Sequence, residues 1–276
     1  MRSERLFKYH GLGNDFFVLD RRDGTPDLDP DAVRWLCDRR RGLGADGILS
    51  LLPSELGAAR MVVHNADGSI AEMCGNGVRV FARYLQHAGL AETGDLAIGT
   101  RAGVRRVHLA KDGDVTVGMG RAALAAGQDA EVTVTVDERS WPARNVGMGN
   151  PHAVAFVADL ADAGRLYGAP EVAPASAYPQ GVNVEFVVDR GPRHVAMRVH
   201  ERGSGETRSC GTGACAVAVA AARRDGVDPA ATGRPETYTV DVPGGRLVVT
   251  EHPDGEVEMT GPAVIVAEGD TAADWL

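Results

Sequence analysis

The chain repeats itself at a fixed offset. Residues 74–77, Cys-Gly-Asn-Gly, recur 136 residues later as 210–213, Cys-Gly-Thr-Gly. The same offset aligns Gly-Leu-Gly-Asn at 11–14 with Gly-Met-Gly-Asn at 147–150. It also aligns Met-Val-Val-His-Asn from residue 61 with Met-Arg-Val-His-Glu from residue 197. Three matches in one ungapped register, at close to half of the 276 residues, indicate a duplicated domain.

The duplication divides the chain into two predicted halves. The N-terminal half, residues 1–122, carries Cys74, and the C-terminal half, residues 123–262, carries Cys210. Apolar residues alternate as in β-strands over 16–19 and 115–117 in the first half, and over 132–136 and 246–250 in the second. Glycine-containing turns at 243–245 and 254–255 indicate hairpins. One helix is expected over 30–41, with Asp29 as its N-cap.

Each Cys-Gly-x-Gly segment precedes a predicted helix. The helix after Gly77 has an apolar stripe on one face and Arg79 and Arg83 on the other. The segment 214–222 after Gly213 is apolar all round, which predicts a buried helix. The fold class is therefore predicted as α+β, with two pseudo-symmetric halves that each wrap a mixed, barrel-like sheet around a central helix.

Composition excludes several classes of protein. A net charge of −9 and a pI near 5.4 argue against a nucleic-acid partner. The charged start at residues 1–8 is unlike a signal peptide, and no apolar run reaches the roughly 18 residues of a membrane span. A cytoplasmic protein with no membrane partner is expected. Four cysteines without a CxxC or CxxxH pair predict neither a disulfide framework nor a metal site. The run Arg39–Arg41 is interpreted as a solvated helix face.

A cysteine at a helix N-terminus has a chemical use. The positive end of the helix dipole and the unpaired N–H groups favour a thiolate and predict a lowered thiol pKa. The neighbouring glycine amides can hold a carboxylate. Two such elements, facing each other across a cleft, suit inversion at a tetrahedral carbon, which needs a base on one face and an acid on the other. No pyridoxal or other cofactor is expected. Cys37 and Cys215 lack this symmetric pairing and are expected to be core thiols.

The motifs resemble those of the diaminopimelate epimerase family. The resemblance runs from the first strand to the last third of the chain, through residues 11–16 (GLGNDF), 65–69 (NADGS), 74–77 (CGNG), 149–152 (GNPH) and 201–214 (ERGSGETRSCGTGA). It implies interconversion of LL- and meso-2,6-diaminopimelate, a step of bacterial lysine and peptidoglycan-precursor synthesis. It also implies a homodimer, and a C-terminal strand, about 263–276, that returns to the first half.

The resemblance also implies a role for individual residues. Cys74 resembles the proton donor and Cys210 the acceptor in the LL-to-meso direction, with His152 and Glu201 as polar groups that assist the thiols. The implied substrate-binding residues are Asn14, Gly47, Asn65, Gly75, Asn76, Asn150, Asn183, Glu201, Arg202, Gly211 and Thr212, of which Gly75, Asn76, Gly211 and Thr212 would hold the reacting α-carboxylate through their amides.

Each polar residue also has a purely structural interpretation. Asn14, Asn65 and Asn150 lie in glycine-rich turns, where asparagine is favoured for its conformation. The adjacent Glu201 and Arg202 could form a surface ion pair, and His152 could be a strand-entry residue. Asparagine is rare inside strands, which makes Asn183 more informative. The offset pairs Asn183 with Gly47, where some family members carry glutamine, so this half is predicted to lack one substrate contact.

Two alternative functions remain open on the sequence. A related two-cysteine epimerase could act on proline or hydroxyproline, but such enzymes typically carry CGHG at the first cysteine, whereas residue 76 is Asn here. Asn76 and the Glu201-Arg202 pair, able to read a distal amino-acid group, favour diaminopimelate. A non-enzymatic thiol protein would instead use Cys74 and Cys210 for a functional disulfide or for zinc.

Overall fold

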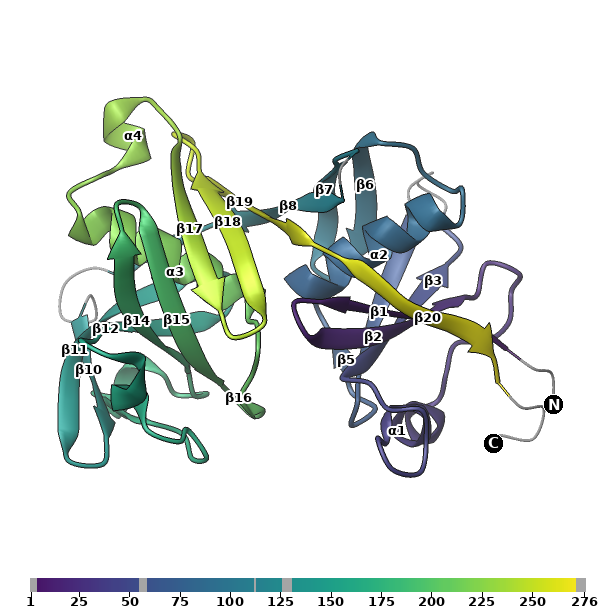
Figure 1. The fold of residues 1–276 in the computed structure, drawn as a ribbon, viewed down its shortest axis with the longest axis horizontal. Helices are drawn as coiled ribbons and strands as arrows, with labels where there is room; N and C mark the ends of the chain where they lie inside the picture. Colours follow the sequence, from purple (N-terminus) through teal and green to yellow (C-terminus); the bar gives the residue numbers. More distant parts are fainter. Residues whose placement is uncertain (1–3, 55–58, 112, 126–130, 272–276) are drawn as a thin grey trace. The chain divides into compact units, whose positions relative to one another are not determined.

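The computed structural model describes residues 4–54, 59–111, 113–125 and 131–271, which form two compact units. Unit 1 comprises Met1–Val117 and Gly261–Leu276, and unit 2 comprises Gly118–Thr260. Strands dominate both units and helices are few, so the fold is α+β, as predicted (Figure 1). Of the C-terminal strand expected over 263–276, the structure has a strand over Val264–Asp270 in unit 1, and residues 272–276 lie outside the described part.

Unit 1 is a mixed sheet with a long helix packed on it. Its strands run in the order β20-β1-β2-β3-β4-β6-β7-β8, with β2–β3 and β4–β6 parallel and the short β5 antiparallel to β4. The elements are β1 (Arg5–Gly11), β2 (Asn14–Asp20), α1 (Pro30–Cys37), β3 (Gly47–Leu52), β4 (Ala59–Asn65), β5 (Ile70–Ala71), α2 (Gly75–His87), β6 (Gly94–Thr100), β7 (Gly103–Leu109), β8 (Asp114–Arg121) and β20 (Val264–Asp270).

Unit 2 repeats this plan. Its strands run β13-β10-β11-β12-β14-β15-β17-β18-β19, with β12–β14 and β15–β17 parallel, and with β9 beside β11 and β16 beside β15. The elements are β9 (Ala123–Leu124), β10 (Glu131–Val136), β11 (Arg139–Gly147), β12 (Pro151–Phe156), β13 (Glu171–Ala173), β14 (Asn183–Gly191), β15 (His194–Glu201), β16 (Gly205–Glu206), α3 (Gly211–Arg224), α4 (Pro229–Thr232), β17 (Glu236–Val242), β18 (Gly245–Glu251) and β19 (Glu256–Pro262), with short 3-10 turns at Leu160–Ala163 and Ala175–Ala177.

The repeat extends beyond the matches visible in the sequence. The offset of 136 relates β3 to β14 and α2 to α3, but from β7 to β18 the offset is 142, because unit 2 has the short helix α4 after α3. The two units differ in which part of the chain supplies one strand of the sheet. β10, which precedes β11 in the chain, pairs with it in unit 2, whereas the equivalent partner of β1 is β20, from the far end of the chain.

Each central helix packs against its own sheet. In unit 1, α2 contacts β1, β2, β4 and β7, and in unit 2, α3 contacts β11, β12, β14, β15, β17 and β18 (Figure 1). Small side chains let the strands approach α3 from all sides, and its residues 214–222 are buried, as predicted. The prediction that Arg79 lies on a polar face of α2 is wrong. Its side chain is fully buried, where its guanidinium donates to the carbonyl oxygen of Pro262 and to the side chain of Asn76.

The first helix is shorter than predicted. Asp29 is its N-cap and accepts from the N–H of Ala32, as expected, but α1 ends at Cys37. The carboxylate of Asp38 accepts from the backbone N–H groups of Arg40 and Arg41, which favours a turn over another helical residue. The run Arg39–Arg41 is therefore not a helix face.

Candidate active site

Both motif cysteines are helix N-caps. The sulfur of Cys74 accepts from the N–H of Gly77 at 3.4 Å at the start of α2, and that of Cys210 accepts from the N–H of Gly213 at 3.3 Å at the start of α3. Cys74 is partly exposed, and Cys210 is only 5% exposed. Cys37 and Cys215 are buried, which confirms the prediction of core thiols.

In unit 1, the thiol of Cys74 lies beside two asparagine side chains. Its sulfur donates to Oδ1 of Asn14 at 3.9 Å, and the same oxygen accepts from Nδ2 of Asn76 at 3.2 Å. The guanidinium of Arg79 donates to Oδ1 of Asn76 at 2.9 Å, which fixes the orientation of that amide. An acceptor on the sulfur favours the protonated form of the thiol.

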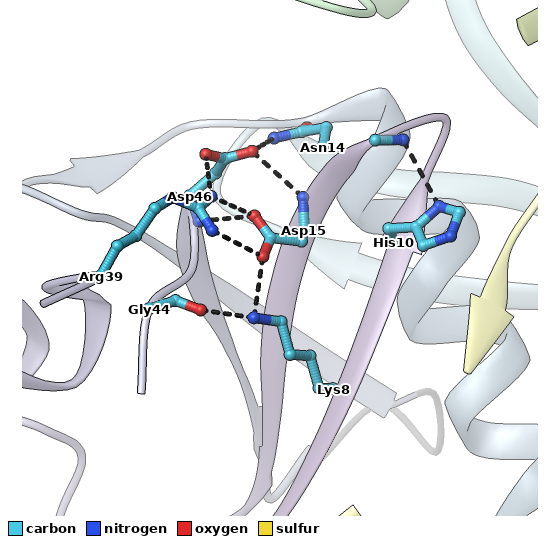
Figure 2. A network of polar contacts seen from close by, with 8 residues as sticks. Lys8, His10, Asn14, Asp15, Arg39, Gly44 and Asp46 are labelled. Atoms are coloured by element: carbon cyan, nitrogen blue, oxygen red, sulfur yellow. Dashed lines mark hydrogen bonds and ion pairs between the residues drawn. The ribbon is translucent and has the colours of Figure 1, made fainter. Parts of the chain in front are cut away.

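The side chain of Asn14 is itself held by a charged network, shown in Figure 2. Its Nδ2 donates to Oδ2 of Asp46 at 2.9 Å, so Oδ1 faces Cys74. Arg39 bridges Asp46 and Asp15, and Lys8 also contacts Asp15, at 3.0 Å. Burial alone would raise the pKa of Asp15, but the hydrogen bonds from Arg39 and Lys8 hold it below its usual range.

Gly47 and Asn65 are direct partners across β3 and β4. A Cβ atom at Gly47 would lie 2.5 Å from the carbonyl oxygen of His64 and 3.3 Å from the ring of Phe16. The close approach of β4 therefore explains the glycine at this position. Nδ2 of Asn65 donates to the hydroxyl of Ser69 at 2.9 Å, within the turn that follows β4.

In unit 2, Cys210 has a more polar environment. Its sulfur lies 3.5 Å from the hydroxyl of Thr212, which accepts from Nδ2 of Asn150 at 3.3 Å. The carboxylate of Glu201 is hydrogen-bonded to the thiol of Cys210, and it also accepts a hydrogen bond from the hydroxyl of Thr207. Burial raises the pKa of Glu201, while the bond from Thr207 opposes that rise and the nearby carboxylate of Glu185 adds to it.

The predicted lowering of the thiol pKa is wrong for Cys210. Burial raises the pKa of this thiol well above its usual value, and the carboxylates of Glu201 and Glu185 raise it further. The hydroxyl of Thr212 and the N–H of Gly213 act in the expected direction, but their effect is smaller.

Asn183 and Arg202 lie together at the start of β14. Nδ2 of Asn183 donates to the carbonyl oxygen of Pro151, and its Oδ1 accepts from the N–H of Arg202, so the side chain joins β12 to the turn after β15. The exposed guanidinium of Arg202 donates to the carbonyl oxygen of Gln180 at 3.1 Å. The carboxylate of the adjacent Glu201 forms its hydrogen bonds with other partners, the hydroxyl of Thr207 and the thiol of Cys210.

Glycines and amides complete both helix starts. Gly75 and Asn76 in unit 1, and Gly211 and Thr212 in unit 2, are the first two residues of their helices. The N–H groups in the first turn of a helix point away from the carbonyl groups of that helix, which makes them donors suited to an anion.

The sequence interpretation missed Glu185 on β14, which pairs with His152. Oε1 of Glu185 lies 2.7 Å from Nδ1 of His152, and both side chains are fully buried. The offset of 136 places them opposite Leu49 and Phe16 of unit 1. At these two equivalent positions, the unit that contains Cys74 has apolar side chains, whereas the unit that contains Cys210 has ionisable ones. The sequence signal that could have identified Glu185 is a glutamate within the mostly apolar segment 182–188.

A second cluster in unit 1 has the residue types of a hydrolase but a different geometry. The hydroxyl of Ser50 and the carboxylate of Asp27 both contact the same nitrogen, Nε2 of His64, at 3.3 and 3.1 Å. A nucleophile–base–orienter arrangement uses the two ring nitrogens separately. Ser50 is also fully buried, so this cluster anchors Asp27 to the sheet.

The difference in exposure predicts an order of thiol modification. With iodoacetamide at pH 8, Cys74 should be alkylated before Cys210, since Cys210 is buried and its thiol pKa is raised. Cys37, whose pKa burial raises to about 12, should react only after unfolding in urea, as should Cys215. Peptide mass spectrometry over time gives the order, and faster labelling of Cys37 than of Cys74 would contradict it.

Within the described ranges, no group of three or more His, Cys, Asp or Glu side chains could hold a metal ion. None of the helices in that part of the chain has the length and apolar character needed to span a membrane.

Known proteins share both the sequence and the fold. The family model for diaminopimelate epimerase matches residues 6–125 and 144–266. A diaminopimelate epimerase of Streptomyces coelicolor is 69% identical over 281 residues, covering 98% of this chain and 96% of that protein. Among solved structures, the phenazine biosynthesis protein of the PhzF family from Bacillus anthracis has a TM-score of 0.72 at 16% identity, over 99% of this chain and 100% of the other.

A hydroxyproline epimerase from Agrobacterium vitis, solved with trans-4-hydroxy-L-proline, has a TM-score of 0.67 at 17% identity, over 99% and 93% of the two chains. At these identities the solved structures support the fold alone. The family model and the Streptomyces relative, which both extend over most of the sequence, carry the assignment: the chain belongs to the diaminopimelate epimerase family.

Proposed function

We propose that this chain is a cofactor-independent epimerase that interconverts LL- and meso-2,6-diaminopimelate with Cys74 and Cys210 as the two acid–base groups. The observation that carries the proposal is the repeated element: each unit presents one cysteine sulfur at the N-terminus of its central helix. A symmetric pair of thiols suits a reaction that differs in its two directions only by the face from which the proton arrives.

The surroundings of the two thiols support a division of labour in the LL-to-meso direction. Cys210 would remove the α-proton, because burial and two carboxylates raise the pKa of its thiol and so make its thiolate the stronger base that a weak carbon acid requires. Cys74 would deliver a proton to the other face, because Oδ1 of Asn14 accepts from its sulfur and favours the thiol. In the reverse direction the two roles exchange.

Preorganised hydrogen-bond donors would lower the free energy of the carbanion that forms during the reaction. As the α-proton leaves, negative charge develops on the carbon and spreads onto the α-carboxylate. The N–H groups of Gly75, Asn76, Gly211 and Thr212 at the two helix starts would stabilise that charge. Stabilisation of this kind by a single donor is typically about 3–4 kcal/mol in enzymes.

The remaining predicted residues would bind the rest of the substrate. Diaminopimelate carries two ammonium and two carboxylate groups, which call for carboxylate, amide and guanidinium partners. Glu201 and the exposed Arg202 on unit 2, with Asn65 on unit 1, supply these chemical types. His152 would act indirectly, through Asn150. Gly47 has no side chain to contribute.

Incorporation of solvent deuterium tests the reaction and the substrate together. Reduced protein treated with a chelator is incubated in D₂O with LL-diaminopimelate, meso-diaminopimelate, L-proline or trans-4-hydroxy-L-proline, and the α-deuterium is measured by mass spectrometry. Deuterium in diaminopimelate, with formation of the other isomer, is the expected result. Deuterium in proline or hydroxyproline alone would contradict the substrate, and a requirement for zinc would contradict the mechanism.

The homodimer implied by the family resemblance and the cytoplasmic location expected from the sequence stay predictions. Analytical ultracentrifugation of the protein and fractionation of cells would test them.

A further inference from the structure

Glu185 is a buried carboxylate whose hydrogen bond to His152 has no task in the proposed mechanism. Its side chain on β14 is fully buried, and within the described part of the chain only Oε1 has a hydrogen-bond partner, Nδ1 of His152 at 2.7 Å. Burial of a carboxylate is costly unless the charge is paired. Unit 1 carries Leu49 at the corresponding position, so the fold itself can be built with an apolar residue there.

A continuous chain of polar contacts leads from Glu185 to the sulfur of Cys210. Beyond the contact with Glu185, Nε2 of His152 lies 3.0 Å from Oδ1 of Asn150. Nδ2 of Asn150 donates to the hydroxyl of Thr212 at 3.3 Å, and that hydroxyl lies 3.5 Å from the sulfur. All five residues belong to unit 2.

Each ring nitrogen of His152 faces an oxygen atom. A carboxylate oxygen faces Nδ1 and an amide oxygen faces Nε2. Both partners are acceptors, an arrangement that is fully hydrogen-bonded when each ring nitrogen carries a hydrogen, as in the imidazolium form. Among the ionisable groups nearby, Glu185 on β14 contacts the ring, Glu201 at the end of β15 interacts with it electrostatically, and the hydroxyl of Tyr178 donates to the carbonyl oxygen of His152 at 3.5 Å.

The protonation of His152 also sets the direction of the chain. Because Asn150 accepts at Oδ1, its N–H₂ group faces Thr212, and the hydroxyl hydrogen of Thr212 is left for the sulfur. Every donor in this series of contacts then points toward Cys210, which favours the thiolate and opposes the direct effect of the Glu185 charge, which raises the pKa of the thiol. A ring protonated only on Nδ1 would favour the opposite direction, with the thiol of Cys210 donating to Thr212.

We propose that Glu185 is a positioning residue for Cys210, which holds His152 as an imidazolium and so directs the Thr212 hydroxyl hydrogen onto the thiolate. Its effect on turnover rests on the proposed epimerase function. Its effect on His152 does not depend on any substrate.

The ring nitrogens of His152 give the first test. In protein labelled with ¹⁵N, long-range ¹H–¹⁵N spectra at pH 7 should show two protonated nitrogens for His152, with the signals assigned by their loss in His152→Gln. In Glu185→Gln, one of the two nitrogens should be deprotonated. A singly protonated ring in the wild type, or an unchanged ring in the variant, would overturn the proposal even if the substrate were wrong.

Turnover gives the second test, through coupling with Thr212. Glu185→Gln should lower kcat by about tenfold to a hundredfold, the range typical of residues that orient a reacting group, and leave KM within about twofold. If Glu185 acts through this series of hydrogen bonds, the double variant that also carries Thr212→Val should be no slower than the slower of the two single variants. Multiplicative losses would show that Glu185 acts independently of the chain and would overturn the proposal.

Two further variants keep these results interpretable. Glu258→Gln removes a carboxylate from a partly exposed Glu–His pair of unit 2, with His252 at 3.0 Å, and should change neither kcat nor the His152 signals. Glu185→Leu introduces the residue present at the equivalent position of unit 1. It should reproduce the His152 signature of Glu185→Gln, and it serves as the test if the glutamine variant does not fold.

Discussion

Cys74→Ala and Cys210→Ala are each expected to abolish epimerisation. Each substitution removes the only acid–base group that the proposed mechanism places on one face of the α-carbon. General acid–base groups contribute about 10²- to 10⁴-fold to enzymatic rates, and a proton that must be taken from carbon lies at the upper end of that range. The rate of isomer formation, followed by chiral chromatography, should therefore fall by about 10⁴-fold in either variant.

Cys37→Ala and Cys215→Ala are the matched controls. Both remove a buried thiol, one from α1 and one from α3, so they reproduce the loss of a sulfur atom without touching the helix starts. A small core deletion of this kind costs about 1 kcal/mol of folding stability and should leave turnover within about twofold. Full activity in Cys74→Ala or in Cys210→Ala would exclude the two-thiol mechanism.

Gly213→Ala is expected to have the second largest effect. A Cβ atom there would lie 2.7 Å from Oε1 of Glu185 and 3.2 Å from the sulfur of Cys210. The carboxylate cannot yield easily, because it is fully buried and bonded to His152. The variant should lose about 1–3 kcal/mol of stability, as overpacked cores do. Its kcat should fall by at least about a hundredfold, since both the thiol and the carboxylate are displaced.

The same substitution in unit 1 provides the comparison. A Cβ atom at Gly77 would lie 3.2 Å from the tip of Leu49 and 3.6 Å from the sulfur of Cys74, and a leucine methyl group can move by a few tenths of an ångström. Gly77→Ala should therefore lose less stability and less activity than Gly213→Ala. Urea unfolding midpoints and kcat of the two variants measure the difference, and equal losses would contradict the argument.

The sequence predicted the parts of this protein that local pattern determines. The duplicated Cys-Gly-x-Gly segments predicted two helix starts with a sulfur at each, and α2 and α3 begin there. Alternating apolar residues predicted strands that the structure contains as β2, β8, β10 and β18. The α+β class followed from the same patterns.

The errors arose where distant residues meet. Arg39 looked like part of a solvated helix, but it bridges Asp15 and Asp46, which a single run of arginines cannot reveal. The thiol pKa of Cys210 was predicted from the helix start alone, whereas burial and the carboxylates of Glu201 and Glu185 outweigh that effect. These carboxylates come from strands β14 and β15, and their approach to α3 depends on the packing of the whole unit.

The origin of β20 has a consequence for protein synthesis. Unit 1 contains most of the residues made first, yet one of the two strands that flank β1 is β20, which ends at Asp270. Unit 2 has all its strands once β19 has left the ribosome. Multidomain chains generally fold from the N-terminus as they emerge. Here the second half can be completed before the first, and until then the ladder groups of β1 that face β20 are an open edge, the kind of surface that chaperones shield.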